Sequence, residues 1–204
     1  MKNIEYNFYY SGPLLFKTKL KDKHIGLFHE IMRDTKKEKQ LIESISSFKI
    51  QVLNKQSVQV TLDPYLNVYK KAYKHWYNRP IRRVSVEECW VNVMKPGDFI
   101  PPHVHTECDL SSVLFLDDLP REIERQGTSG PQPGSLNFIF CTSGGKMNVN
   151  ESNHIPKKGD FFIFPSDLTH WVFPFKDECK RLSIAANYKI NYWKNKPIPR
   201  GKRG

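Results

Sequence analysis

The sequence predicts a mainly β domain (α+β), folded as a double-stranded β-helix or jelly roll, with N-terminal helices packed outside it. From residue 84 onward, short runs of alternating apolar and polar residues are separated by Gly, Pro, Asn and Asp clusters. Before that point, apolar residues recur at the spacing of amphipathic helices. We therefore expect one domain over residues 1–188, helical over about 20–80 and a barrel over about 84–188, followed by a basic tail over 189–204.

The first helix is predicted in "DKHIGLFHEIMRD", where Ile25, Phe28 and Ile31 or Met32 lie on one face. The polar stretch "DTKKEKQLIESISSFKI" follows, and we expect its first residues to form a loop. A helix of this kind buries its apolar face and leaves its charged face in water. It should therefore pack against the outside of the barrel.

The second helix is predicted in "LDPYLNVYKKAYKHWYNRP". Asp63 is expected as its N-cap and Pro64 as its first residue, because proline is tolerated where no N–H is needed. The helix should end before Pro80, since the residue that precedes a proline is disfavoured in helical conformation. Its apolar face comprises Leu66, Tyr69, Tyr73 and Trp76. Aromatic residues at this spacing indicate core packing against the barrel.

The barrel strands are short and closely spaced, which is typical of a sandwich, jelly roll or small barrel. The predicted strands are "VSVEECWVNVM", "LSSVLFL", "GSLNFIF", "KMNVN", "GDFFIFP" and "RLSIAANYK". The loop "DDLPREIERQGTSGPQPG" interrupts them and is long, charged and rich in Gly and Pro. Such a loop is either a lid over the mouth of the barrel or a functionless insertion.

The net charge of +11, from 32 basic and 21 acidic residues, is high for a chain of this length. A basic balance is typical of proteins with nucleic-acid or other acidic partners. Part of it comes from the tail "KINYWKNKPIPRGKRG", which contains Lys and Arg but no acidic residue. We interpret the tail chiefly as a solubilising terminus, with weak anion binding as the alternative.

The four cysteines are expected to be free thiols. No C-x-x-C pair occurs among Cys89, Cys108, Cys141 and Cys179. No apolar run approaches the roughly 20 residues of a membrane span, and the first residues lack the features of a secretory signal. We therefore expect a soluble cytoplasmic protein without a membrane partner.

Two closely spaced histidines and one distant histidine form a candidate metal site. His103 and His105 lie in "PGDFIPPHVHTECDLSSVLFL", and residues two apart on an extended strand point to the same side. His170 follows the apolar strand of "GDFFIFPSDLTHWVFP", where Phe164, Pro165 and Trp171 are expected to form a dry wall. Two close ligands and one from a distant strand suit a transition metal.

The last predicted strand adds a carboxylate-binding group. In "RLSIAAN", Arg181, Ser183, Ala185 and Asn187 share one face, and Leu182, Ile184 and Ala186 share the other. A buried guanidinium needs a partner, and its planar fork suits a bidentate carboxylate. Metal ligands beside such an arginine indicate a small dicarboxylate that also chelates the metal.

These blocks together resemble the 2-oxoglutarate and Fe(II)-dependent oxygenase superfamily. The pattern "PGDF-x-PPHVH…LSSVLFL…GDFFIFPSDLTHWVFPF…RLSIAAN" is similar, more narrowly, to a family of oxygenases common in bacteria and marine phages. The opening "YNFYYSGPLLFKTKL" also resembles the N-terminus of that family. A phage-encoded member would act in the cytoplasm of its host.

The resemblance implies Fe(II) at His103 and His170, with His105 at the second position of the H-x-[D/E] pair. Arg181, helped by Ser183, would hold the distal carboxylate of 2-oxoglutarate. Asn92 is a weaker candidate for cosubstrate binding or for supporting the metal ligands. The implied reaction couples oxidative decarboxylation of 2-oxoglutarate, with O2, to hydroxylation of a prime substrate that the sequence does not define. The basic charge favours an anionic one.

The chain departs from the superfamily pattern at position 105, where a carboxylate usually stands. Three ligand sets remain open: His103, His105 and His170; a set in which Asp109 joins or replaces His105; and His105 with Glu107 as an H-x-E pair. Alternation does not separate them, because residues 103, 105, 107 and 109 share parity. We prefer them in the order given.

Two other functions compete with the oxygenase. A cupin-like metalloenzyme that does not use 2-oxoglutarate would share the barrel, and the cupin patterns G-x5-H-x-H-x3-[E/D] and G-x5-P-x4-H fit residues 97–109 and 159–170. Arg181 and Ser183 argue against it, because a cupin has no need of them. A non-catalytic, anion-binding barrel is the third hypothesis, and it depends on the net charge alone.

Overall fold

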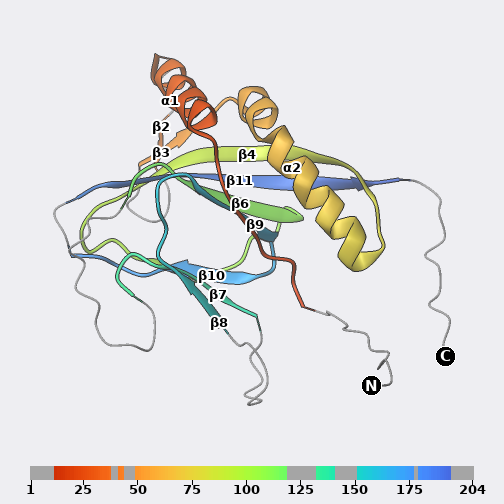
Figure 1. Cartoon of the computed structure of the whole chain (residues 1–204). Helices are drawn as coiled ribbons and strands as arrows, with labels where there is room; N and C mark the ends of the chain where they lie inside the picture. Colours follow the sequence, from red (N-terminus) through yellow and green to blue (C-terminus); the bar gives the residue numbers. More distant parts are fainter. Residues whose placement is uncertain are drawn as a thin grey trace, which may run out of the picture.

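The computed structural model describes residues 12–37, 41–43, 49–118, 132–140, 151–176 and 179–193. Two antiparallel sheets face each other, one of seven strands in the order β1-β9-β6-β11-β4-β3-β2 and one of four in the order β5-β10-β7-β8. Figure 1 shows both helices on the outer face of the seven-stranded sheet and the four-stranded sheet beneath its inner face. The predicted double-stranded β-helix with outer helices is therefore confirmed.

The elements in chain order are β1 (Phe16–Lys19), α1 (Asp22–Lys37), β2 (Leu41–Glu43), β3 (Lys49–Val52), α2 (Lys55–Tyr77), β4 (Ile81–Met94), β5 (Ile100–His103), β6 (Leu110–Phe115), β7 (Leu136–Ile139), β8 (Glu151–His154), β9 (Asp160–Pro165), β10 (Thr169–Val172) and β11 (Arg181–Tyr192). Neither helix in the described ranges is long and apolar enough to cross a membrane.

Helix α1 forms where the sequence predicts it, with Ile25, Phe28 and Met32 buried. The loop expected from Asp34 onward is wrong, because the helix continues to Lys37. No Gly or Pro interrupts this stretch, and lysine is a good helix former. The helix therefore continues until its apolar face ends.

Helix α2 begins earlier than predicted, at Lys55, so the expected N-cap at Asp63 and start at Pro64 are wrong. Asn54 is the N-cap, and its side-chain oxygen accepts a hydrogen bond from the Ser57 N–H at 3.0 Å. Pro64 lies inside the helix. Burial of Val58 and Leu62 extends the apolar face by two turns, and this outweighs the backbone hydrogen bond that the proline removes.

The other end of α2 agrees with the sequence. Asn78 is the C-cap in the left-handed conformation, two residues before Pro80. Leu66 and Tyr69 are buried and Tyr73 packs against them, but Trp76 is 50% exposed, so its assignment to the apolar face is wrong. Tyr77 instead packs against Tyr73, with a distance of 4.7 Å between the ring centroids.

A β-bulge explains why strict alternation fails on β4. The pairing with β11 passes from Asn187↔Glu88 to Tyr188↔Val86, which leaves Glu87 unpaired. Val84 and Cys89 differ in parity, yet both are buried in the core beneath the helices. The extra residue resets which side chains face inward.

Two apolar cores lie on either side of the seven-stranded sheet. The outer one packs α1 and α2 against the sheet and includes Leu62, Tyr69 and Ile184. The inner one lies between the two sheets and is mostly aromatic, with Phe115, Phe138, Phe162, Phe164 and Phe175 buried. Burying such a side chain contributes roughly 2–3 kcal/mol. This rigid inner core supports the site described next.

The predicted barrel runs correspond to β4, β6, β7, β9 and β11. Strands β1, β5, β8 and β10 were not predicted as separate runs, because four residues are too few for alternation to register. β11 continues to Tyr192, into the expected tail. The run "KMNVN", most of the long charged loop, Cys141 and residues 194–204 lie outside the described residues.

Candidate active site

The three predicted histidines meet at one edge of the four-stranded sheet. His103 ends β5 and pairs across the ladder with His170 of β10. His105 follows two residues later, and its backbone N–H donates to the Ser166 carbonyl at 2.8 Å. One ligand atom from each of the three side chains lies within 4.8 Å of the others. The sequence expected this convergence from strand parity, and the structure brings the three together.

The rings are arranged around a common point. The ring centroids of His103 and His170 are 4.2 Å apart, and His105 lies 5.2 Å from each of them. Phe164 packs on His170 with a centroid distance of 4.6 Å, as the predicted dry wall requires. By strand alternation, Trp171 points away from His170, so it belongs to a different surface.

Backbone carbonyls hold two of the imidazoles in one tautomer. Nδ1 of His103 is 2.8 Å from the Pro101 carbonyl oxygen, and Nδ1 of His170 is 2.9 Å from that of Leu168. A carbonyl oxygen only accepts, so each Nδ1 carries the proton and donates it. Each Nε2 then has a free lone pair. Metal-binding histidines usually donate their other ring N–H to an oxygen acceptor in this way.

Burial keeps the site uncharged. Burial, and then the nearby His103, lower the pKa of His170 to about 3 and that of His105 to about 4. Both imidazoles are therefore neutral at physiological pH, which is the form that binds a metal. Three imidazole nitrogen donors, one of them on the buried His170, fit a divalent transition metal.

Ser166 fastens the loop after His103 to the turn before His170. Its hydroxyl donates to the Cys108 carbonyl at 2.6 Å, and its backbone N–H donates to the Asp109 carbonyl at 3.2 Å. Its own carbonyl accepts from His105. Ser166 is the serine of the "FPSDLTH" block, and its bonds hold His105 at a set distance from His170. Sequence reasoning did not assign it a role.

The structure does not bring Asp109 or Glu107 to the histidines. The Asp109 carboxylate accepts a hydrogen bond from the Ile190 N–H at 2.7 Å, near the end of β11. Glu107 is exposed. The histidine cluster contains neither residue. The sequence analysis kept these residues as candidate ligands because they share the parity of His103. Alternation does not apply to them, because residues 104–109 are a loop between β5 and β6.

Arg181 lies at the start of β11, buried between the two sheets and 1% exposed. One terminal nitrogen donates to the Gly134 carbonyl and the other contacts the Met94 sulfur at 2.9 Å. The guanidinium carbon lies 5.1 Å and 5.9 Å from the ring centroids of Phe115 and Phe175. These four neighbours were not predicted; Met94, Phe115 and Gly134 are more than 40 residues away from Arg181 in sequence.

The guanidinium has unused hydrogen-bond donors. Its Nε is buried without any hydrogen-bond partner. No ion pair of Arg181 occurs in the described part of the chain. Burial lowers its pKa to about 10, so it stays charged at neutral pH. A buried cation with an N–H that donates to no acceptor is unfavourable unless an anion accepts that hydrogen bond and compensates the charge. The cradle therefore fits a carboxylate.

Ser183 and Asn92 lie beside Arg181 on the inner face of the sheet, as predicted. They pair across β11 and β4. Ser183 is buried, and the Asn92 amide oxygen accepts a hydrogen bond from the Trp90 indole at 3.0 Å. The Trp90 ring lies 6.3 Å from His105. This row of polar groups links the guanidinium to the histidines along one face.

The strand pairing places Arg181 and His170 in the same space. Gly134, the partner of Arg181, precedes β7 by two residues, and β7 pairs Leu136 with Val172 and Phe138 with His170. The guanidinium and the metal site thus lie along the same pair of strands.

The remaining histidines and cysteines have structural surroundings. His24 bonds Tyr65 at 2.6 Å, and His154 bonds Ser152 at 2.8 Å. Cys108 is buried with its sulfur 3.7 Å from the Ser111 hydroxyl, outside the histidine cluster. Cys89 and Cys108 are free thiols, as expected.

Residues 88–187 match the family described as "Putative 2OG-Fe(II) oxygenase". This span holds β4 to β11 and every residue of the site. The barrel of the chain belongs to the 2OG-Fe(II) oxygenases, the family its motifs resemble, which use Fe(II) and 2-oxoglutarate (2OG). A comparison with curated proteins finds no match.

Solved structures share the fold at low sequence identity. A Pseudomonas putida prolyl-4-hydroxylase superposes with a TM-score of 0.58 and 17% identity, over 86% of this chain and 91% of that one. A viral collagen prolyl hydroxylase from Paramecium bursaria Chlorella virus-1, in its 2OG complex, gives 0.54 and 12%, over 85% and 94%. The epimerase SnoN, in complex with Fe3+, alpha ketoglutarate and nogalamycin RO, gives 0.57 and 13%, over 87% and 80%.

Proposed function

We propose that the protein is a hydroxylase in which His103, His105 and His170 hold Fe(II) and Arg181 binds 2OG. One observation carries the proposal: a cluster of three imidazoles lies between the same two sheets as a buried guanidinium whose Nε has no hydrogen-bond partner among the described residues. The family match supports the cofactors. A cupin-like enzyme or an anion-binding barrel would leave the burial of Arg181 unexplained.

Each side chain has a separate task. The Nδ1–H groups of His103 and His170 stay bonded to backbone carbonyls, so their Nε2 atoms remain directed to the metal. Arg181 orients the distal carboxylate of 2OG through its unused N–H groups, and Ser183 is positioned to add one donor. The aromatic residues around Arg181 and His170 exclude water.

Bound iron supplies the redox chemistry that couples decarboxylation of 2OG to oxygen insertion into a C–H bond of the substrate. A third imidazole in place of the usual carboxylate leaves the metal with one more unit of positive charge. We expect this charge to strengthen the hold on the dianionic cosubstrate.

The test is anaerobic addition of Fe(II) and then 2OG, followed by the visible charge-transfer band and by succinate release in air. We expect the band in the native protein and its loss, with at least a 1,000-fold fall in turnover, in His170→Ala. His75→Ala, on the exposed end of α2, is the matched control. A band that persists in His170→Ala, or that requires no 2OG, would contradict the proposal.

A further inference from the structure

A groove lies on the outer face of the seven-stranded sheet, between the C-terminal half of α2 and the start of β4. A cavity of about 420 Å³ is lined by Asn67, Lys70, Lys71, Lys74, Pro80 and Ile81. A second, of about 300 Å³, shares Asn67 and Lys70 with it and continues past Arg82 and Arg83. The two cavities adjoin at Asn67 and Lys70, and we call them together the α2–β4 groove.

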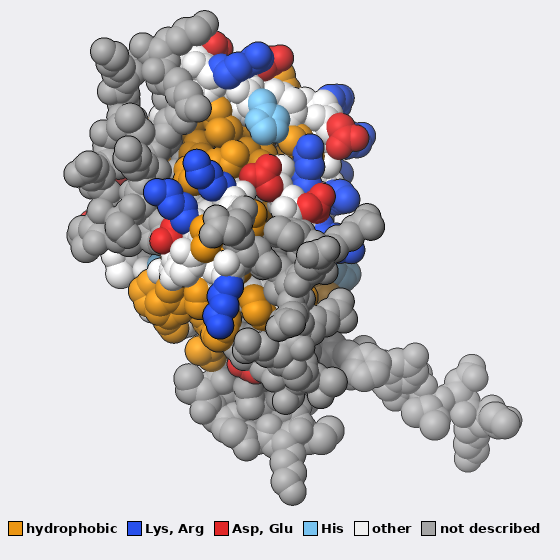
Figure 2. All heavy atoms as spheres, turned by 90° about the vertical axis from the view of Figure 1, so that its left-hand side faces the viewer, with side chains coloured by type: hydrophobic (Ala, Val, Ile, Leu, Met, Phe, Trp, Pro, Cys, Tyr) orange, Lys and Arg blue, Asp and Glu red, His pale blue; other side chains and the backbone are white. Residues whose placement is uncertain are grey.

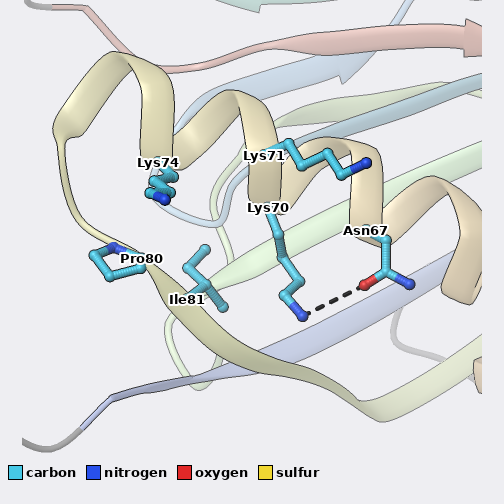
Figure 3. A pocket seen from close by; sticks show the side chains of 6 residues that line it. All are labelled: Asn67, Lys70, Lys71, Lys74, Pro80 and Ile81. Carbon is cyan, nitrogen blue, oxygen red and sulfur yellow. Dashed lines mark hydrogen bonds between the residues drawn. The ribbon is translucent and has the colours of Figure 1, made fainter.

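The groove is strongly basic. Five of its lining residues carry a positive charge: Lys70, Lys71, Lys74, Arg82 and Arg83. Its one acidic residue, Asp63, accepts a hydrogen bond from Gln59 at 2.6 Å. Figure 3 shows Lys70 and Lys74 beside the start of β4, with Lys70 reaching toward Asn67.

The five cations of the groove form no ion pairs with the acidic side chains that the structure describes. On the face shown in Figure 2, by contrast, acidic side chains stand among the basic ones. The helix dipole stabilises a positive charge in the last turn of α2, which explains Lys74 there. It does not explain Lys70 or the two arginines, which lie outside that turn. Like charges gathered without counter-charges repel one another, and an anionic ligand relieves that repulsion.

An exposed aromatic ring lies beside one arginine of the groove. Trp193 follows β11 directly, where Tyr192 pairs with Ile81, and it is 61% exposed. The guanidinium of Arg82 lies 5.6 Å from its ring centroid. A basic channel combined with an exposed aromatic ring is the arrangement that binds single-stranded nucleic acid, with phosphates in the channel and a base on the ring.

We propose that the α2–β4 groove binds the phosphate backbone of a single-stranded nucleic acid. The groove lies on the opposite face of the sheet from the iron site, at the other end of β4. Arg83 and Asn92 are separated by about 30 Å at the usual rise of a strand. A polymer held there would be kept on the enzyme without occupying the 2OG site. A concave channel of this kind suits a strand of phosphates better than the flat surface of a membrane.

The test is the fluorescence anisotropy of a labelled 12-nucleotide single strand, DNA or RNA, with the full chain over a range of NaCl concentrations. We expect a slope of log K against log [NaCl] between about −2 and −3.5, since up to five cations displace counterions. The combined variant Lys70→Ala, Lys74→Ala and Arg82→Ala should bind at least tenfold more weakly and lower the slope by about 2. Trp193→Ala should weaken binding about fivefold or more.

The matched control removes the same charge elsewhere: Lys23→Ala, Arg33→Ala and Lys158→Ala, all exposed outside the groove. This control variant should change the affinity for the single strand less than twofold.

Equal losses of affinity in the groove variant and the control variant would overturn the proposal, because net charge alone would then explain binding. So would a loss that follows only Lys196→Gln, Arg200→Gln and Lys202→Gln in the tail. Stronger binding to phosphatidylserine vesicles or to a polyglutamate peptide than to the single strand would also overturn it. Succinate release by the groove variant shows that it is folded.

Discussion

The two faces of the seven-stranded sheet differ in how their positively charged side chains are placed: one is single and buried, and the others form an exposed cluster. On the inner face, Arg181 is buried, isolated and surrounded by aromatic rings. On the outer face, Arg82 and Arg83 are exposed beside three lysines. None of these arginines has a carboxylate partner in the described residues. A buried, single cation selects one small anion by geometry and is little affected by salt, whereas an exposed cluster attracts a polymer and is screened by salt.

The largest expected effect separates the two faces directly. Arg181→Ala removes the charge-assisted hydrogen bonds to 2OG, so we expect the apparent KM for 2OG to rise about 100-fold at any NaCl concentration. Arg33→Ala, exposed on α1, is the matched control and should leave KM unchanged. Succinate release measures both. A rise in KM that disappears at low salt would mean that Arg181 acts through long-range charge instead.

A smaller effect is expected from Ser166, which positions His105 without touching the metal. Ser166→Ala removes the hydroxyl bond to the Cys108 carbonyl, so the loop that carries His105 loosens. We expect Fe(II) affinity to fall about tenfold with little change in the KM for 2OG. Iron titration of the apoprotein checks this. Ser57→Ala on α2 is the matched control. An equal rise in KM would show that the whole site is distorted.

A buried side-chain amide, that of Gln59, fixes α2 to the outer face of the sheet. Removing this amide should lower the stability of the protein without changing 2OG binding. The Gln59 side chain accepts from the Val86 N–H at 2.7 Å and donates to the Val84 carbonyl, tying α2 to β4. Gln59→Ala leaves these groups unpaired, so the free energy of unfolding should fall by about 2 kcal/mol. Denaturant unfolding measures it, with the exposed Gln56→Ala as control. A changed KM for 2OG would show that the two faces are coupled.

The smallest effect is expected at Asp109, and it tests the ligand set. Asp109→Asn keeps an acceptor for the Ile190 N–H and removes only the charge. Because the carboxylate lies outside the histidine cluster, Fe(II) affinity should change less than twofold. Iron titration measures this beside the Asp98→Asn control. A tenfold loss confined to Asp109→Asn would place this carboxylate among the ligands.

Motif order predicted more of the molecule than local propensity did. The blocks around His103, His170 and Arg181 lie on β5, β10 and β11, and the three histidines lie close together. The start of α2 was wrong because the local signal of Asp63 and Pro64 was outweighed by burial of Val58 and Leu62 further along the same face. Capping signals depend on the residues of a single helical turn. The length of the helix depends instead on how far its apolar face stays packed against the sheet.

The sequence by itself determined the fold class, the family and which histidines converge, because the order of motifs is a property of the chain alone. Only the tertiary structure decided that Asp109 turns toward β11, that Ser166 joins the two histidine segments, and that Arg181 has no carboxylate partner among the described residues. It also decided that three helix lysines and two strand arginines line one groove. These facts depend on loops and on contacts between distant residues, and no local periodicity records them.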